Sequence, residues 1–517
     1  MIVEDKEEHT ICTSRMVLRT VFVSFLLLIV MRCSSQTPPM LTSHRCYGGT
    51  NEDRGNSIRR TVDGGYIFCG ITSSGDSDVS GFHGGTDGWI VKVDVNGDIE
   101  WQRSLGGTSG DDARSVQQTS DGGYIIAGIS WSNDGDVSGV HGLGDIWVVK
   151  LTVDGSIDWQ RAIGGSHEDF TFQIIETAEG GYALLGYTFS NDGDVTDFSV
   201  SGGPWLIKLN SDGGMLWQRT FPGGLHSIQQ TPDLGYILSG SSAGPAPLYP
   251  IDARLLKLNS LGETVWERTY GGSENDGFSK MERTSDGGYV AVGWTNSLDG
   301  DVTGNHGGGD VWIVKTNDVG DLEWQSAIGG TSVDGGLDIT ISASGGYYVL
   351  ANVYSTDGDL IGFQGPQGVW LVKLDSVGAI VWRSAYVGNC VDFVSSAEGF
   401  VVLGHGGWFG DFSCNLGTEH SDIWIAQYTF SEVGISERSS KNLILSPNPV
   451  SSILSVRSDD LPCCTLATIK DLLGRDIFQQ RIQDQTSSID CTGMASGMYT
   501  LSVLLPSGLV TKVFVVE

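Results

Sequence analysis

Basic residues are scarce in this chain of 517 residues: 30 Lys and Arg face 62 Asp and Glu, giving a formal net charge of −32. Such a surface repels phosphate backbones, so we expect no nucleic-acid partner. The same charge suits solubility and cation binding. Long apolar runs are also missing, since the run from Val21 to Met31 has only eleven residues and is too short to span a bilayer.

That short run has the features of a secretory signal. Arg15 and Arg19 precede it, and small and polar residues follow at positions 34–36. We therefore expect residues 1–36 to be a leader that contains a signal peptide. The acidic opening MIVEDKEEHT is unlike the basic start of such a signal, so Met16 is an alternative true start.

Paired-cysteine motifs are absent too. Seven cysteines remain if Cys12 and Cys33 leave with the leader, and none forms a CxxC pair, so a zinc site is unsupported. Lipidation of Cys33 is disfavoured because Arg32 stands where a small residue is needed. One or two disulfides are expected in an oxidising compartment, but the spacing leaves their connectivity open.

Familiar catalytic motifs are missing as well. The sequence contains no HExxH, P-loop or dinucleotide fingerprint. Residues 240–244, GSSAG, fit the spacing G-x-S-x-G, but they end an expected strand and enter a proline-rich loop instead of a helix. A nucleophile elbow needs the strand–turn–helix context, so we discount it.

The chain does contain an internal repeat. DGGYIIAG at Asp121 and IWVVKL around Trp147 each occur in seven versions, and WQR at Trp101 occurs in six. Successive copies in the first three repeats lie 58 residues apart. The segments are rich in β-branched and aromatic residues and are bounded by Gly and Asp, which predicts strands. A glycine four residues before each WQR-type tryptophan, such as Gly97, predicts a hairpin turn with positive φ.

Four strands per repeat, counting one over the DDARSVQQT stretch, match the size of a propeller blade. The seventh repeat lacks its own WQR strand. Residues 47–50 (YGGT) match 105–108 (LGGT), the tail of that strand, so we predict that residues 41–47 complete the last blade and close the ring. The fold class is thus all-β, with a seven-bladed β-propeller over residues 41–430. An open β-solenoid or two separate sheets are the alternatives.

These repeats resemble bacterial β-propeller repeats of the SBBP type, from Gly48 to about Phe430. The resemblance implies an exported propeller. It implies little about activity, because such families have varied functions.

The composition changes after Phe430. Residues 431–442 are polar and predict a linker, and residues 443–517 read as short alternating strands of a small C-terminal β-sandwich. Four motifs follow in order: PNP, a DxxGR-like turn, GxY and a lysine-led last strand. In this order they resemble the type A C-terminal sorting domain of the type IX secretion system, although Glu517 stands where a basic residue is common. The matching residues are Pro447, Asn448, Pro449, Asp471, Gly474, Arg475, Gly497, Tyr499 and Lys512.

This second resemblance implies a route and partners. Such proteins cross the inner membrane by their signal peptide and the outer membrane through the type IX machinery. Its sortase usually removes the sorting domain, and the cargo is released or attached to surface lipopolysaccharide. We therefore expect a secreted or cell-surface protein that passes through the periplasm.

An acidic pattern recurs in the loops between the second and third strands. Carboxylates at i and i+2 could hold Ca²⁺, the one cofactor we consider, but two carboxylates do not fill its shell of six to eight oxygens. An Asp–Gly turn multiplied by duplication is the alternative. The candidate ligands are Asp134, Asp136, Asp192, Asp194, Asp299, Asp301, Asp357 and Asp359, with Asp76 and Asp78 in the first repeat.

Three of these loops also carry a histidine four residues before an aspartate. Such a pair can bind a metal or transfer a proton. Its recurrence in three repeats favours hydrogen bonding within the loop over a unique catalytic site. The pairs are His83–Asp87, His141–Asp145 and His306–Asp310.

Two loops break the repeat, at residues 241–252 and 406–421. Trp408, Phe409 and His420 in the second are candidate ligand-binding residues, because irregular loops on a regular scaffold often carry function. Drift at the closure site is the alternative. We expect a non-catalytic binding or scaffold module for a glycan or protein ligand. A propeller hydrolase or lyase acting on polysaccharide is the alternative, and it would need convergent carboxylates at a mouth of the channel.

Overall fold

The chain folds into two compact units, Met1–Phe430 and Ser431–Glu517. The computed structural model describes residues 38–197, 202–242, 250–343, 345–360, 368–386, 389–396, 399–406, 414, 421–430, 444–446, 450–457, 465–470, 476–482, 486–505 and 508–516. Over these ranges, no helix has the length and apolar character needed to cross a membrane.

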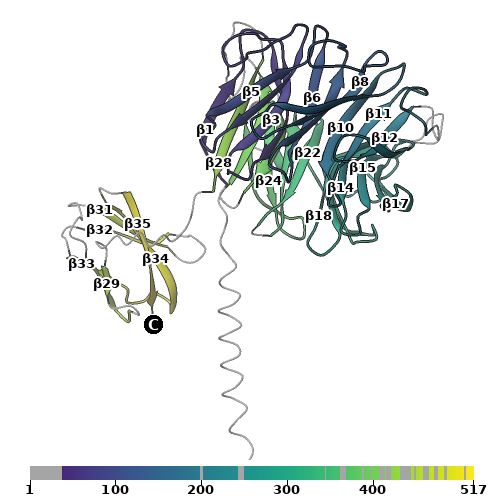
Figure 1. The fold of residues 1–517 in the computed structure, drawn as a ribbon. Helices are drawn as coiled ribbons and strands as arrows, with labels where there is room; N and C mark the ends of the chain where they lie inside the picture. The colour runs from purple at the N-terminus through teal and green to yellow at the C-terminus, as the bar shows by residue number, and fades with distance from the viewer. Residues whose placement is uncertain are drawn as a thin grey trace, which may run out of the picture. The chain divides into compact units, whose positions relative to one another are not determined.

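Within the described residues, the first unit contains seven antiparallel sheets of four strands, each forming one blade (Figure 1). The predicted seven-bladed propeller is therefore confirmed. Blade 1 contains β2 (Asp53–Arg60), β3 (Tyr66–Thr72), β4 (Asp87–Val93) and β5 (Ile99–Leu105). Blade 2 contains β6 (Asp111–Gln118), β7 (Tyr124–Ser130), β8 (Asp145–Leu151) and β9 (Ile157–Ile163). Blade 3 contains β10 (Asp169–Glu176), β11 (Tyr182–Thr188), β12 (Gly203–Leu209) and β13 (Met215–Thr220).

The next three blades repeat this order. Blade 4 contains β14 (Gly224–Gln230), β15 (Tyr236–Ser241), β16 (Ala253–Leu258) and β17 (Thr264–Tyr270). Blade 5 contains β18 (Asp276–Arg283), β19 (Tyr289–Thr295), β20 (Asp310–Thr316) and β21 (Leu322–Ile328). Blade 6 contains β22 (Asp334–Ile341), β23 (Tyr347–Val353), a 3₁₀ turn η1 (Gly358–Leu360), β24 (Gly368–Leu374) and β25 (Ile380–Tyr386).

Blade 7 takes its outer strand from the start of the propeller. β26 (Asn389–Ser395), β27 (Gly399–Gly406) and β28 (Asp422–Thr429) are completed by β1 (Met40–Tyr47), which pairs antiparallel with β28. This confirms the prediction for residues 41–47. A disulfide between Cys46 and Cys414 joins β1 to the connection between β27 and β28. The propeller is thus closed by both hydrogen bonds and a covalent bond.

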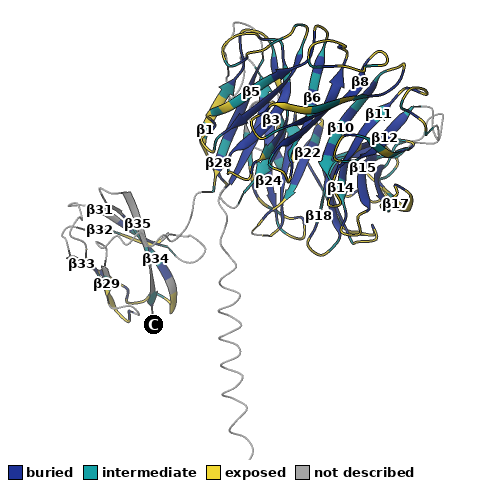
Figure 2. Cartoon of the chain, in the orientation of Figure 1, coloured by how far each residue is buried: buried dark blue, intermediate teal, exposed yellow. Residues whose placement is uncertain are grey.

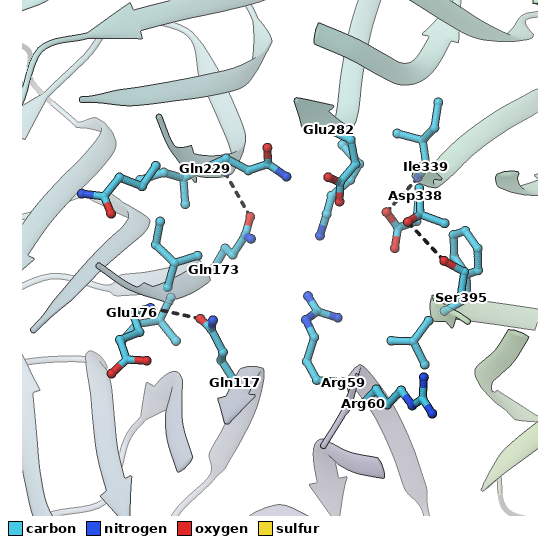
Figure 3. Close-up of a pocket in the computed structure, with 18 residues that line it drawn as sticks. Arg59, Arg60, Gln117, Gln173, Glu176, Gln229, Glu282, Asp338, Ile339 and Ser395 are labelled. Atoms are coloured by element: carbon cyan, nitrogen blue, oxygen red, sulfur yellow. Dashed lines mark hydrogen bonds between the residues drawn. The ribbon is translucent and has the colours of Figure 1, made fainter. Parts of the chain in front are cut away.

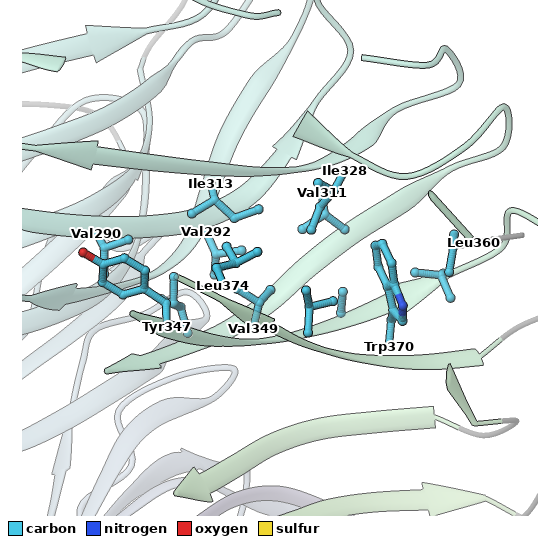
Figure 4. Close-up of a cluster of buried hydrophobic side chains, with 14 residues drawn as sticks. Val290, Val292, Val311, Ile313, Ile328, Tyr347, Val349, Leu360, Trp370 and Leu374 are labelled. Atoms are coloured by element: carbon cyan, nitrogen blue, oxygen red, sulfur yellow. The ribbon is translucent and has the colours of Figure 1, made fainter. Parts of the chain in front are cut away.

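Apolar residues on both faces of the second and third strands fill the space between blades. One cluster packs Val292 and Ile313 of blade 5 against Val349 and Trp370 of blade 6 (Figure 4). The central strands are accordingly buried and the connecting loops exposed (Figure 2). Face-to-face stacking of blades explains why these strands lack the alternation of a half-exposed sheet.

The WQR glutamine has a structural role in four blades. In blade 2 the buried Trp147 indole donates to Gln160 Oε1 at 2.9 Å, which meets the need of a buried indole N–H for an acceptor. The same bond forms in blades 1, 3 and 5. In blade 4, Arg254 stands at the tryptophan position and Glu267 at the glutamine position, and these two side chains form an ion pair at 3.0 Å.

The hairpin glycines before the WQR-type tryptophans have positive φ, as predicted; Gly155, for example, has a φ of 78°. A second constraint acts on Gly155, since a Cβ there would lie 2.8 Å from the Trp101 ring of the preceding blade. The turn conformation and the contact between blades therefore both require glycine.

The second unit, considered by itself, has two described sheets. One contains β29 (Ile444–Ser446), β30 (Ile453–Arg457) and β33 (Thr486–Asp490). The other contains β31 (Thr465–Lys470), β32 (Asp476–Ile482), β34 (Gly497–Leu505) and β35 (Gly508–Val516). Leu454 and Ile489 of the first sheet share one core with Ile469 and Leu501 of the second, as in the predicted β-sandwich.

Candidate functional site

The innermost strand of each blade lines a central cavity. These seven strands, β2, β6, β10, β14, β18, β22 and β26, each have one strand neighbour in their sheet, so one edge is left free. The cavity between them has a volume of about 540 Å³, and side chains from all seven blades converge on it (Figure 3).

Side chains from neighbouring blades satisfy the free edges of these strands. An exposed row of N–H groups would otherwise attract another chain. Gln173 of blade 3, for example, accepts from Ile228 N of blade 4 at 3.0 Å. Equivalent bonds run from Ile58 N to Asp392 Oδ2 (2.9 Å), Ile174 N to Ser115 Oγ (3.2 Å), Glu176 N to Gln117 Oε1 (3.0 Å) and Arg283 N to Gln229 Oε1 (3.1 Å).

Charge is distributed unevenly around the cavity. When the inner strands are aligned by their pairing register, the residue equivalent to Ser57 of blade 1 is Ser, Gln and Ser in blades 2 to 4. In blades 5 to 7 the equivalent residue is charged: Lys280, Asp338 and Asp392. The position of Arg59 holds Gln, Ile and Gln in blades 2 to 4, but Glu282 in blade 5. At these two positions the adjacent blades 5, 6, 7 and 1 therefore form a charged wall, whereas the acid that blade 3 contributes to the cavity is Glu176, one position further along its strand.

Arg59 and Asp392 form the closest ion pair in this wall. Arg59 Nη1 lies 2.7 Å from Asp392 Oδ2, and the aspartate side chain is only 8% exposed. Burial alone would lower the pKa of Arg59, but the charges of Asp392 and Asp338 and the hydrogen bond to Asp392 together outweigh it, and the pKa rises. Burial would likewise raise the pKa of Asp392, but Arg59 and Lys280 outweigh it and lower the pKa.

Two other acids in the wall shift in the opposite direction. Burial raises the pKa of Asp338 well above its ordinary value, and the neighbouring Asp392 charge raises it further. Burial also raises the pKa of Glu282. The wall thus combines two acids whose pKa values are raised, Asp338 and Glu282, with an acid whose pKa is lowered, Asp392, and with the basic side chains of Arg59 and Lys280.

The predicted calcium ligands hold the Gly-Gly turns between blades. Asp134 accepts hydrogen bonds from Thr108 N and Oγ1, both at 2.8 Å, and Asp136 accepts from Gly106 N at 3.4 Å. Asp192 and Asp194, Asp299 and Asp301, and Asp357 and Asp359 bond the equivalent turns. Over the described residues no three His, Cys, Asp or Glu side chains are placed to hold a metal. Calcium binding stays a prediction.

The three His–Asp pairs form hydrogen bonds within their loops, which confirms the structural interpretation. The Nδ1–Oδ2 distances are 2.9 Å for His83–Asp87 and 2.8 Å for both His141–Asp145 and His306–Asp310. The bonds to Asp145 and Asp310 raise the pKa of His141 and His306.

Several predicted residues lie outside the described part of the chain. They are the leader 1–36 with Met16, the linker 431–442, the loop residues Trp408, Phe409 and His420, and the sorting-motif residues Pro447, Asn448, Pro449, Asp471, Gly474 and Arg475. The other sorting-motif residues are described: Tyr499 in β34 donates from its hydroxyl to Ala495 O at 2.8 Å, and Lys512 in β35 pairs with Leu501.

Sequence reasoning missed the five charged residues of blades 5, 6, 7 and 1 described above, as well as Arg60 and Glu176, which line the same cavity. Arg59, Lys280, Glu282, Asp338 and Asp392 sit in the least regular segment of each repeat. A usable signal was present: aligned on the DGGY segments, both positions are uncharged in blades 2 to 4, whereas the first is charged in blades 5 to 7 and the second in blades 1 and 5.

Comparison with known proteins identifies the second unit. Residues 445–517 match the family model described as "Secretion system C-terminal sorting domain". No curated protein matches the chain. The match places a type IX export signal at the end of this chain, which makes it a secreted or cell-surface protein.

Several solved structures resemble this chain at low sequence identity. PorZ, a surface component of the type IX secretion system of Porphyromonas gingivalis, is 12% identical with a TM-score of 0.42, over 91% of this chain and 60% of PorZ. BamB from Moraxella catarrhalis is 12% identical with a TM-score of 0.37, over 75% of this chain and 99% of BamB. YCF48 bound to D1 peptide is 11% identical with a TM-score of 0.41, over 77% and 98% of the two chains.

Proposed function

Given a β-propeller that a type IX sorting domain delivers to the cell surface or the medium, we propose that it binds a small zwitterionic ligand in its central cavity and catalyses no reaction on it. The observation that carries the proposal is the charged wall of blades 5, 6, 7 and 1, which places groups of both signs in a cavity of about 540 Å³. That volume is within the range of small-molecule sites.

Four of the charged groups of the wall divide into two sets, and the fifth, Asp338, is considered below. Arg59 and Asp392 pair with each other, so they rigidify the wall more than they attract a ligand. Lys280 and Glu282 come from one strand, β18, and both line the cavity. A ligand with a carboxylate and an ammonium group would neutralise these two side chains in a site where water is restricted.

The hydrogen bonding of Asp392 argues against catalysis. Its Oδ2 accepts from Ile58 N and Arg59, and its Oδ1 accepts from Phe393 N at 3.0 Å. A carboxylate whose oxygens are all occupied is a poor general base or nucleophile. The group therefore serves the closure between blades 7 and 1.

A hydrolase or lyase acting on polysaccharide is the second candidate. One observation favours it: the pKa values of Asp338 and Asp392 shift in opposite directions, as expected of an acid and a base that share a site. Release of oligosaccharides from a polysaccharide panel, lost in Asp338→Asn, would support this candidate over the first.

Calorimetric titration of the purified chain with amino acids, dipeptides and neutral monosaccharides tests the proposal. We expect an amino acid or dipeptide to bind, and Glu282→Gln to weaken it by about tenfold, since a bond to a charged group contributes roughly 1.5–3 kcal/mol. Glu263→Gln, the same change in an exposed hairpin, is the matched control. Binding of no zwitterion, or equal binding by Glu282→Gln, would refute the proposal.

The delivery route has its own test. We propose that the type IX machinery and its sortase are the transport partners, with lipopolysaccharide as the surface anchor. Deletion of residues 443–517 should leave the propeller in the periplasm, as measured by fractionation and surface proteolysis. Normal surface display of the truncated chain would contradict this route.

A further inference from the structure

Blade 3 carries a cluster of aromatic side chains that the repeat does not explain. Phe170, Phe172, Tyr187 and Phe189 form what we call the blade 3 aromatic cluster. The Phe170 and Tyr187 rings are stacked at 5.7 Å with an interplanar angle of 10°, Phe170 meets Phe172 edge-on at 5.3 Å, and Tyr187 lies 4.9 Å from Phe189. His226 of blade 4 extends the cluster, with its ring 5.0 Å from Phe172.

The cluster is specific to blade 3. At the Phe170 position the register places Arg54 in blade 1, Asp112 in blade 2 and glycine in blades 5 and 6. Inherited packing therefore does not account for Phe170, although the position of Phe189 is also aromatic in blades 2 and 6, as Trp131 and Tyr354. Phe189 is 51% exposed, and the other three rings are half-buried. Such an exposed apolar group, framed by polar residues, is typical of a binding surface.

The cluster lies at one end of the central channel. Phe170 and Phe172 are in the first half of β10, whereas Gln173 to Glu176, in its second half, line the cavity. In other blades too the cavity is lined by the later residues of the inner strand, such as Arg59 and Arg60. Since each inner strand follows the same connection from the preceding blade, the cluster faces the mouth where these strands begin.

Two polar residues beside the cluster, Arg114 and Asn56, share Asp112 as their partner. The Arg114 guanidinium lies 5.2 Å from the Phe170 ring centre, and its Nε is paired with Asp112 at 2.8 Å. Asn56 donates to the same Asp112 at 2.8 Å. Because the guanidinium against the Phe170 ring is already paired with an acid, the site favours an uncharged ligand that has both apolar faces and hydroxyl groups.

We propose that the blade 3 aromatic cluster is a binding site for neutral carbohydrate. The apolar C–H face of a pyranose ring would stack on Phe189 and Tyr187, and its hydroxyls would bond Arg114, Asn56 or His226. The overall charge of −32 adds to the argument, because it disfavours polyanionic glycans at long range. This site is separate from the zwitterion site proposed above, since it uses different residues of the channel.

Binding of neutral oligosaccharides tests the proposal. Hexasaccharides of β-glucan, xylan, mannan, chitin, galactan and α-glucan are titrated against the full chain by calorimetry, with an alginate oligomer as the anionic comparison. We expect at least one neutral sugar to bind and Phe189→Ala to weaken it by about five- to tenfold, the usual value of one aromatic contact.

Tyr354→Ala is the matched control, because Tyr354 is 46% exposed at the equivalent position of blade 6. Unchanged binding by this variant, and by Glu282→Gln, would separate the two sites. Absence of binding by every neutral sugar, preference for alginate or for a proline-rich peptide, or wild-type affinity of Phe189→Ala would each overturn the proposal.

Discussion

Reduction of the Cys46–Cys414 disulfide should destabilise the propeller measurably. The bond closes a loop with a sequence separation of 368 residues. In the chain-entropy description, so long a loop restricts the unfolded chain by about 6 kcal/mol, whereas native disulfides usually contribute roughly 2–5 kcal/mol. We therefore expect a loss of about 4 kcal/mol.

The corresponding change in melting temperature follows from the size of the unit. With an unfolding entropy of roughly 2.1 cal/mol/K per residue over about 390 residues, 4 kcal/mol corresponds to a fall of about 5 °C. β1 also keeps its backbone pairing with β28 and the Arg45–Asp98 ion pair at 2.7 Å, so the reduced protein should still close.

Differential scanning calorimetry with and without a phosphine reductant measures this shift, and thiol alkylation with mass spectrometry establishes the redox state. The double variant Cys46→Ser/Cys414→Ser is the control: it should melt about 5 °C below the oxidised wild type and should not respond to the reductant. A fully reduced wild type that melts at the oxidised temperature would refute the reasoning.

Three more predictions concern the repeat. Partial burial raises the pKa of Asp121, but hydrogen bonds from Thr119 and Lys150 lower it to about 2, so the ionised side chain stabilises the fold above pH 4 and this contribution is lost as the pH falls towards 2. Because the Asp121 side chain is 62% exposed, Lys150→Met should reduce the pH dependence of the free energy of unfolding in this range by no more than about 1 kcal/mol, as measured by acid unfolding. Gln160→Leu should cost about 1–3 kcal/mol in urea unfolding by leaving the Trp147 indole without its acceptor, whereas equal stability would show that the bond contributes nothing. Because Thr108 already donates two hydrogen bonds to the Asp134 carboxylate, a chelator should leave the melting temperature of the protein unchanged, and a fall in that temperature would support the calcium sites.

The fold could be predicted because its determinants are local and repeated. Gly155, Trp147 and Gln160 recur at fixed spacing, and each blade solves the same packing problem, so periodicity identified the strands and the closing segment. The cavity wall could not be found this way. Asp338 and Glu282 are single departures in a variable segment, and only the closed propeller brings blades 5, 6, 7 and 1 together.

The blade 3 aromatic cluster was missed for a related reason. Phe170 and Tyr187 are ordinary strand residues in the sequence, and only their register with Arg54 and Asp112 in other blades shows them to be unusual. The two irregular loops attracted attention instead, because a break in periodicity is easier to see than a substitution within it. The pair of buried Arg254 with the partly exposed Glu267 shows the opposite case, a double change that preserves one structural role.

The pairing of β1 with β28 also sets the order of events during biogenesis. β1 is the first strand of the propeller to be synthesised, and its partner β28 follows some 380 residues later. The last blade therefore cannot assemble while the chain is still being made, or while it is being transported with its amino end first. Completion is postponed until nearly the whole propeller is available to fold. Until then β1 has no strand partner, and a chaperone that shields it would raise the yield of the folded protein.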